Sequence, residues 1–171
     1  MTGNIFLRDA VEEDAVFLFD LVNDFECRNN SFHPDKVLYE EHLKWLKKIL
    51  TSQTQKQYIL VEGEKLIGQG RLELIGSTCR ISYSVIPERR GCGYGKVLVQ
   101  LLNNAIIQSF PDCLYSYGEV LKKNVSSQKI FEELGYEMEE REEYFYYQKQ
   151  TDYYAEHQIC LKKPGGDFAL K

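Results

Sequence analysis

Residues 89–96 read Arg89-Arg90-Gly91-Cys92-Gly93-Tyr94-Gly95-Lys96, with three glycines at alternate positions between basic side chains. The preceding residues 79–86 alternate apolar and polar side chains and end at Pro87, which is typical of a β-strand. Residues 97–102 are mostly apolar and indicate the start of a helix. A strand, a glycine turn and a helix in this order direct successive backbone N–H groups at an anion, and glycine lets the backbone approach a phosphate closely. The stretch therefore predicts a phosphate-binding turn.

The spacing of the glycines narrows the kind of phosphate ligand. A P-loop needs four residues between its first glycine and Gly-Lys, followed by Ser or Thr, whereas Gly91 is too close to Lys96 and a valine follows. The dinucleotide fingerprint fails because its third glycine arrives one residue early. What remains is Arg90-x-x-Gly93-x-Gly95, which resembles the acetyl-CoA pyrophosphate loop, [QR]-x-x-G-x-[GA], of the GCN5-related N-acetyltransferases. The alternative is a glycine-rich turn that only caps a helix.

Length, composition and charge exclude several classes of protein. The chain has 171 residues and a net charge of −5, which fit one globular domain without a basic run for nucleic acid. It has neither an apolar run of membrane-spanning length nor a signal-peptide pattern at its N-terminus. Its five cysteines form no C-x-x-C pair, so no metal site is expected and we interpret them as reduced cytoplasmic thiols. Cys92 is expected to be a small filler in the glycine turn rather than a nucleophile.

Periodicity predicts an α+β fold with one mixed central sheet, and the family resemblance implies that this sheet is mostly antiparallel and flanked by helices. Strands are expected at residues 4–8, 58–61, 66–75, 79–86 and 114–121, helices at 15–22, 37–50, 97–110 and 124–134, and a loop at 24–35. Residues 136–147 and 153–161 are expected to form a closing hairpin. We expect residues 1–163 to be a single N-acetyltransferase domain, and residues 164–171, which begin Pro-Gly-Gly, to be a disordered tail. The element order β-α-α-β-β-β-α-β-α-β-β matches the acetyltransferase family over nearly the whole chain.

A second motif lies one helix and one strand further along the chain. The segment Asn124-x-x-Ser127-x-x-x-Phe131-x-x-Leu134-Gly135-Tyr136 resembles the family segment N-x-x-[SA]-x-x-x-[YF]-x-x-x-G-[FY]. In the family this asparagine and the following helix line the CoA side of the site. Asn124 is also a plain N-cap residue, and the two roles are compatible.

The resemblance implies how acetyl-CoA binds and reacts. An amine attacks the thioester directly, and a backbone N–H at Val85 or its neighbour stabilises the oxyanion. The backbone of Val85 and Ile86 also pairs with pantetheine, which requires strands 79–86 and 114–121 to splay apart. The residues expected to bind acetyl-CoA are Val85, Ile86, Arg90, Gly91, Cys92, Gly93, Tyr94, Gly95, Lys96, Asn124 and Ser127.

The proton-transfer groups are less constrained by the sequence. Glu73, on strand 66–75, which precedes strand 79–86, and His33, in the 24–35 loop, are candidate bases, and each is alternatively a solvated side chain. Glu26 and His42 are further candidates. Phe131 stands where many family members carry a tyrosine that protonates the leaving thiolate, so either the thiolate leaves unassisted or another tyrosine serves. The tyrosines at residues 144–154 are candidates, although packing at a sheet edge or in a homodimer is the alternative.

The acceptor is the least determined part of the reaction. Residues 26–31 and 40–46 are similar to family members that acetylate amino groups on nucleotide-linked sugars, such as the pseudaminic-acid pathway enzymes. Arg28 is then a candidate partner for an acceptor phosphate or carboxylate, and otherwise a solvated loop arginine. Polyamines fit the acidic charge of the chain. Two alternatives remain, a protein N-terminal acetyltransferase of the ribosomal-protein type and a non-catalytic acyl-CoA-binding module.

Overall fold

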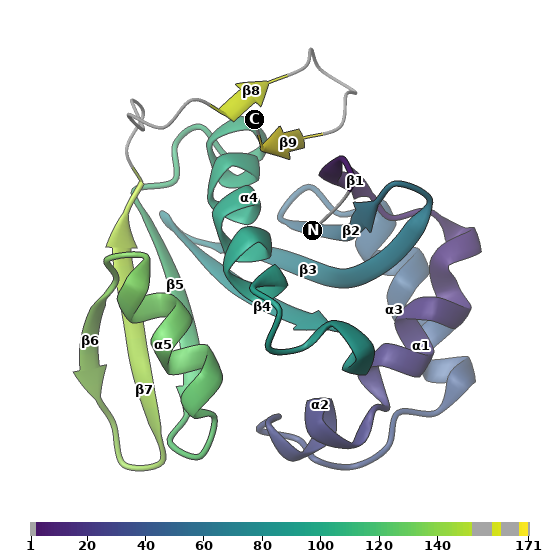
Figure 1. Cartoon of the computed structure of the whole chain (residues 1–171), viewed down its shortest axis with the longest axis horizontal. Helices are drawn as coiled ribbons and strands as arrows, with labels where there is room; N and C mark the ends of the chain where they lie inside the picture. Colours follow the sequence, from purple (N-terminus) through teal and green to yellow (C-terminus); the bar gives the residue numbers. More distant parts are fainter. Residues whose placement is uncertain (1–2, 152–158, 162–167, 171) are drawn as a thin grey trace.

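The computed structural model describes residues 3–151, 159–161 and 168–170. In these residues one nine-stranded sheet has the order β6-β7-β5-β4-β3-β2-β1-β9-β8, with helices on both faces (Figure 1). Its strands are β1 Ile5–Asp9, β2 Gln55–Glu62, β3 Lys65–Ile75, β4 Thr78–Val85, β5 Tyr115–Leu121, β6 Glu137–Glu140, β7 Tyr144–Gln150, β8 Ile159–Leu161 and β9 Phe168–Leu170. The helices are α1 Ala15–Val22, α2 Phe25–Asn29, α3 Tyr39–Leu50, α4 Tyr94–Ser109 and α5 Val125–Glu133, with short 3-10 turns at Glu12–Asp14 and Pro87–Arg89.

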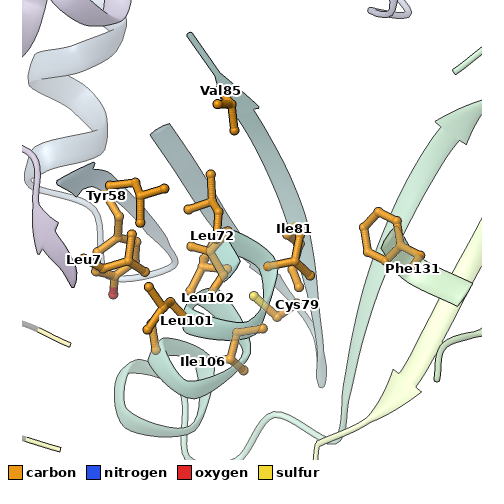
Figure 2. Packing of buried hydrophobic residues seen from close by; sticks show 14 of the residues in the cluster. Leu7, Tyr58, Leu72, Cys79, Ile81, Val85, Leu101, Leu102, Ile106 and Phe131 are labelled. Atoms are coloured by element: carbon orange, nitrogen blue, oxygen red, sulfur yellow. The ribbon is translucent and has the colours of Figure 1, made fainter. Parts of the chain in front are cut away.

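The sheet separates two hydrophobic clusters. The larger cluster packs α4 against the sheet, and Figure 2 shows Leu72 and Ile81 of the strands next to Leu102 of the helix. The smaller cluster packs α1 and α3 against the opposite face of β2, through Leu18, Leu46 and other residues. β2 is buried on both faces, since alternate residues serve each cluster. The sheet is therefore the middle layer of three.

The strands β4 and β5 are parallel and separate along their length. They pair only from Thr78–Arg80 to Tyr115–Tyr117, although β4 continues to Val85 and β5 to Leu121. The other neighbouring strands are antiparallel, so this is a mostly antiparallel sheet with one parallel pair that opens towards its C-terminal ends (Figure 1). The predicted fold class and the predicted splay are both confirmed.

Two boundaries in the N-terminal half differ from the predictions. The expected loop at 24–35 contains the short helix α2, because the Asp24 side chain accepts hydrogen bonds from the N–H groups of Glu26 and Cys27. The next helix begins at Tyr39 rather than residue 37. Asn23 binds both the N–H and the carbonyl of Val37, which keeps that residue outside the helix.

The C-terminal strands also differ from the predictions. The closing hairpin is β6–β7, both within or next to residues 136–147, whereas β8 pairs with β9 at the opposite edge beyond β1. The predicted strand at 153–161 is described only at Ile159–Leu161. Of the predicted tail, residues 164–167 and 171 lie outside the described residues, while Phe168–Leu170 forms β9, so the expectation of disorder is wrong for those three residues. No helix of the described residues is long and apolar enough to cross a membrane.

Candidate active site

The glycine turn leads directly into α4 at the open end of β4. Gly91 and Gly93 have φ values of +71° and +87°, which residues other than glycine rarely adopt. Gly93 is the N-cap, and no side chain of the described residues caps this helix end. The first helical hydrogen bond here is donated by the Val97 N–H to the Gly93 carbonyl at 3.3 Å, so the preceding N–H groups have no partner within the helix. These N–H groups and the positive end of the helix dipole suit a phosphate.

The third glycine of the motif has a packing role. A Cβ on Gly95 would lie 2.8 Å from the Cδ1 atom of Ile130, which belongs to α5. Glycine therefore lets α5 approach the first turn of α4. The ammonium of Lys96 reinforces this contact, because it donates to Glu133 of α5 at 2.8 Å.

Other side chains of the motif point away from a phosphate position. Tyr94 is buried, and its hydroxyl donates to Glu62 at 2.7 Å, so only its backbone is available to a ligand. Cys92 is exposed, and its thiol faces the Arg90 carbonyl at 3.5 Å. The expected binding role of these residues is therefore limited to their N–H groups.

The edge of β4 that faces β5 extends beyond the paired residues to Val85. The Ile86 N–H already donates to the Ile67 carbonyl of β3 at 2.9 Å, which argues against the predicted pairing of this group with pantetheine. Since hydrogen bonding alternates along an antiparallel ladder, the Val85 N–H points the other way, towards the side of β5. Its carbonyl accepts a hydrogen bond from Arg90 Nε at 3.1 Å.

Among the residues of the motif, Arg90 differs most from the orientation that the motif implied. Its Nη2 donates to Asp24 at 2.5 Å and its Nη1 to Glu26 at 2.7 Å. Although burial raises the pKa of Asp24, the hydrogen bonds from Arg90 and from the Cys27 N–H outweigh it and lower that pKa. The positive charge of Arg90 is therefore compensated by α2 and its cap instead of facing the glycine turn.

The second motif ties the start of α5 to β4. Asn124 is the N-cap and accepts a hydrogen bond from the Ser127 N–H at 3.2 Å, as its capping role predicts. The Ser127 hydroxyl lies 2.8 Å from the hydroxyl of Tyr83 on β4. Burial raises the pKa of Tyr83 to about 12. The side chains of Asn124 and Ser127 therefore both form hydrogen bonds within the protein.

Phe131 has a packing reason to lack a hydroxyl. It is 1 % exposed, and its ring contacts the rings of Tyr136 and Tyr147. In Figure 2 it lies apart from the group around α4. A Cβ placed on Gly118 of β5 would lie 2.3 Å from the Cζ atom of Phe131, so the para position of the ring is directly against the β5 backbone. A tyrosine hydroxyl has no room at this position.

On the sheet face that lies opposite α4, near the point where β4 and β5 separate, two carboxylates flank an arginine. Arg80 forms ion pairs with Glu73 of β3 and, at 3.6 Å, with Glu119 of β5. Burial raises the pKa of Glu73, but hydrogen bonds from Arg80 and Gln55 lower it overall, which makes this carboxylate a weaker base. Glu119 lies two residues beyond the last residue of β5 that pairs with β4. Sequence reasoning missed Glu119, although its alternation with Tyr117 places it on the same face as Arg80.

The remaining predicted residues are dispersed. His33 is exposed between α2 and α3, and Glu26 is paired with Arg90. His42 is buried, with its Nε2 3.0 Å from the Ala15 carbonyl, and burial lowers its pKa. Arg28 donates from Nη1 to the carbonyls of His33 and Asp35, so this nitrogen is used within the segment, and a contact of Arg28 with an acceptor anion stays a prediction.

Comparisons with known proteins agree with this geometry. The curated acetyltransferase PseH of Campylobacter jejuni subsp. jejuni (serotype O:23/36, strain 81-176) is 26 % identical over 147 residues, which cover 81 % of this chain and 83 % of that protein. The solved spermidine N-acetyltransferase of Vibrio cholerae, in complex with CoA and spermine, has a TM-score of 0.74 at 19 % identity and covers 86 % of this chain and 95 % of its own. The ribosomal L7/L12 alpha-N-protein acetyltransferase RimL, in complex with coenzyme A, has a TM-score of 0.76 at 16 % identity, with 89 % and 96 % covered.

The two structural neighbours show that the fold is shared across enzymes named for different acceptors. The model of the acetyltransferase (GNAT) domain matches residues 4–137, which span β1 to the start of β6 and include the glycine turn and the Asn124 motif. The chain belongs to the GNAT family of N-acetyltransferases.

Proposed function

We propose that the protein transfers an acetyl group from acetyl-CoA, its cosubstrate, to a primary amine of a small molecule by direct attack on the thioester. The observation that carries this proposal is the α4 N-terminus. Gly91 and Gly93 have positive φ values there, and the free edge of β4 at Val85 lies next to it. Backbone N–H groups of residues 91–96 then bind the pyrophosphate, and the Val85 N–H donates to the oxyanion of the tetrahedral intermediate.

We propose Glu119 as the base that accepts the proton of the attacking amine. Its carboxylate is half-buried, and its contact with Arg80 is 3.6 Å long, whereas Glu73 is closely held by both Arg80 and Gln55. Glu119 also lies further along β5, where the strand has left β4. Glu73 and His33 remain predictions from the sequence, and acid-to-amide substitutions compare the two carboxylates directly.

We infer that the thiolate of CoA leaves without taking a proton from a tyrosine. Phe131 has no hydroxyl, and Tyr83, the nearby tyrosine on β4, has a pKa of about 12. A thiol has a pKa of about 8.5, well below that of the buried Tyr83 hydroxyl, so moving a proton from Tyr83 to the thiolate is unfavourable. Tyr83 then packs against Phe131 and binds Ser127 rather than acting as the acid.

For the acceptor we propose a nucleotide-linked amino sugar or, second, a polyamine. The match to PseH and the similarity of residues 26–31 and 40–46 to the sugar-modifying enzymes support the first. The spermidine enzyme supports the second. The likeness to RimL keeps transfer to a protein N-terminus as an alternative. The net charge of −5 supports a reaction without nucleic acid. We propose a single domain acting in the cytoplasm, whose sheet includes β9 beyond the predicted end at residue 163.

The test is acetyl-CoA turnover, followed as free thiol, against a panel of amines. The panel holds nucleotide-linked amino sugars, polyamines, an aminoglycoside and short peptides with free N-termini. We expect turnover with one class of small amine and none without an amine. Turnover with peptides alone would support the protein acetyltransferase, and tight acetyl-CoA binding without turnover on any amine would contradict the proposed reaction.

A further inference from the structure

The segment of residues 24–36 is folded on itself and closed at its base. The Asn23 side chain binds both backbone groups of Val37, at 3.0 and 2.8 Å, which brings the two ends of the segment together. Within it, Arg28 Nη1 donates to the carbonyls of His33 and Asp35, at 3.1 Å each. Compact surface loops with closed ends and internal hydrogen bonds are often functional.

The segment contacts both strands of the parallel pair beyond their C-terminal ends. On the β4 side, Asp24 and Glu26 bind Arg90. On the β5 side, Asn29 accepts a hydrogen bond from Lys123 at 3.0 Å, and the ring of Phe32 meets that of Tyr144, at the start of β7, edge to face with a centroid separation of 5.4 Å. Figure 1 shows α2 lying across the end where β4 and β5 have separated. The segment therefore bridges the two strands between which the thioester has to lie.

Each nitrogen of the Arg90 guanidinium is used in holding this bridge. Nε binds the Val85 carbonyl, Nη1 binds Glu26 and Nη2 binds Asp24. The Asp24 side chain is 18 % exposed and that of Glu26 60 %, so the pair with Asp24 is the less screened of the two. Arg90 thus joins three parts of the protein, the end of β4, the glycine turn and the 24–36 segment.

We propose that Arg90 is a positioning residue for the acceptor, which holds the 24–36 segment beside the thioester and couples binding at the glycine turn to binding of the amine. This inference rests on the proposed function, since the amine has to approach between β4 and β5. It departs from the motif, which implies that Arg90 serves the pyrophosphate. By linkage, acetyl-CoA binding then orders the 24–36 segment, and removal of either partner of the ion pair uncouples the two sites.

The experiment compares Asp24→Asn, Arg90→Gln and the double variant by amide hydrogen exchange and steady-state kinetics. Asparagine can still cap α2, so Asp24→Asn removes the charge while keeping the helix start. Glu88→Gln, an exposed acid in the turn before the glycines, is the control with the same change of charge. We expect exchange in residues 25–36 to rise in both single variants, and the KM for the amine to rise roughly five- to tenfold with little change in kcat.

The double variant and the affinity for acetyl-CoA decide between the two roles of Arg90. If Arg90 acts through Asp24, the double variant is no worse than either single one, and acetyl-CoA slows exchange in residues 25–36 only in the wild type and in Glu88→Gln. If Arg90→Gln weakens acetyl-CoA binding about tenfold while Asp24→Asn leaves exchange and KM unchanged, the proposal is overturned and Arg90 serves the pyrophosphate. Because hydrogen exchange and acetyl-CoA affinity are measured without an acceptor, these two parts of the test do not depend on whether the amine panel finds a substrate.

Discussion

At the scale of single residues, the site depends on how charged groups are shared. Arg80 lies between Glu73 and Glu119 on one face, and Arg90 lies between Asp24 and Glu26 beside the glycine turn. In each group one carboxylate is held closely, and a closely held carboxylate with a lowered pKa is a poor acceptor of protons. The loosely held Glu119 is therefore the carboxylate that we assign to proton transfer.

Substitution of the two carboxylates of the Arg80 group distinguishes them. We expect Glu119→Gln to lower kcat about 10²-fold with acetyl-CoA affinity unchanged, because it removes the base. Glu73→Gln is expected to lower kcat less than about tenfold, since it only loosens Arg80. Rates for both variants from pH 6 to 9 provide the measurement. A larger loss in Glu73→Gln than in Glu119→Gln would reverse the assignment.

Gly93→Asp tests the anion site at the start of α4. An aspartate there places a carboxylate beside the pyrophosphate and strains a residue with φ +87°, so we expect acetyl-CoA affinity to fall at least about 100-fold. Gly76→Asp is the matched control, because Gly76 also has a positive φ, +61°, and a Cβ there meets no described atom within 4 Å. Calorimetric titration with acetyl-CoA should show normal affinity in the control. Equal losses in both would mean that strain, not the anion site, is responsible.

At this scale, the sequence could predict contacts between residues that are close together in the chain, but not contacts between residues that are far apart in it. The glycine turn and the Asn124 cap are local patterns, and the structure places both as predicted. The motif predicted that Arg90 faces a phosphate. Its partners in the structure, Asp24 and Glu26, are more than sixty residues away in the chain, so no sign of these ion pairs was present in the sequence. Glu119 was missed because only the pairing of β4 with β5 shows that it lies next to Arg80.

At the scale of elements, α5 packs closely against β5 at a position where β5 has a glycine. The Phe131 ring lies against the backbone of Gly118, and the same helix approaches α4 through Gly95. This double contact explains why the helix carries phenylalanine at the position of the family tyrosine. The helix therefore contributes packing and an N-cap, and we assign the donor for the oxyanion to β4.

Two substitutions test this contact. Gly118→Ala and Phe131→Tyr should each lower the free energy of unfolding by about 1–3 kcal/mol, because both place an atom where the other residue packs. Phe131→Leu combined with Gly118→Ala should recover part of the loss, since the smaller side chain leaves room for the methyl group. Urea unfolding measures these differences. A more active Phe131→Tyr variant of unchanged stability would show that the hydroxyl has room after all.

At the scale of the whole molecule, α1 and α3 cover the sheet with a histidine buried between them. His42 is 3 % exposed, packs on Phe19 and Trp45, and contacts the Ala15 carbonyl through Nε2. Burial lowers the pKa of His42 below its usual value of 6.5 despite that hydrogen bond. The cover of the sheet is therefore most stable when this ring is neutral.

The sign of the resulting pH dependence follows from proton uptake. Below pH 6.5 the unfolded chain takes up a proton at His42 before the folded protein does, so the free energy of unfolding should fall as the pH is lowered from 7.5 to 5.5. His42→Phe should flatten this dependence, whereas His33→Gln, at the exposed histidine, should leave it unchanged. Urea titrations at several pH values measure it. A slope that survives in His42→Phe would assign it to other groups.

At this scale, the sequence predicted the pairing of strands that follow one another in the chain. The order of most elements followed from the periodicity of the sequence, and the separation of β4 from β5 followed from the family resemblance. In contrast, β8 and β9 pair beyond β1 at the edge opposite to the predicted hairpin. Pairing between the chain's two ends has no local signal, because neither the turn nor the spacing fixes the partner strand.

Direct transfer of the acetyl group is tested best with acetyl-CoA labelled in the acetyl carbons and the amine that the panel identifies. Mass spectrometry of the products and of the intact protein, taken during turnover, locates the label. We predict that it appears on the amine nitrogen in equal amount to the thiol released, with none on the protein, and that Gly93→Asp gives neither product. Label held on a protein side chain such as the Cys27 or Cys92 thiol, and passed from there to the amine, would contradict direct attack on the thioester.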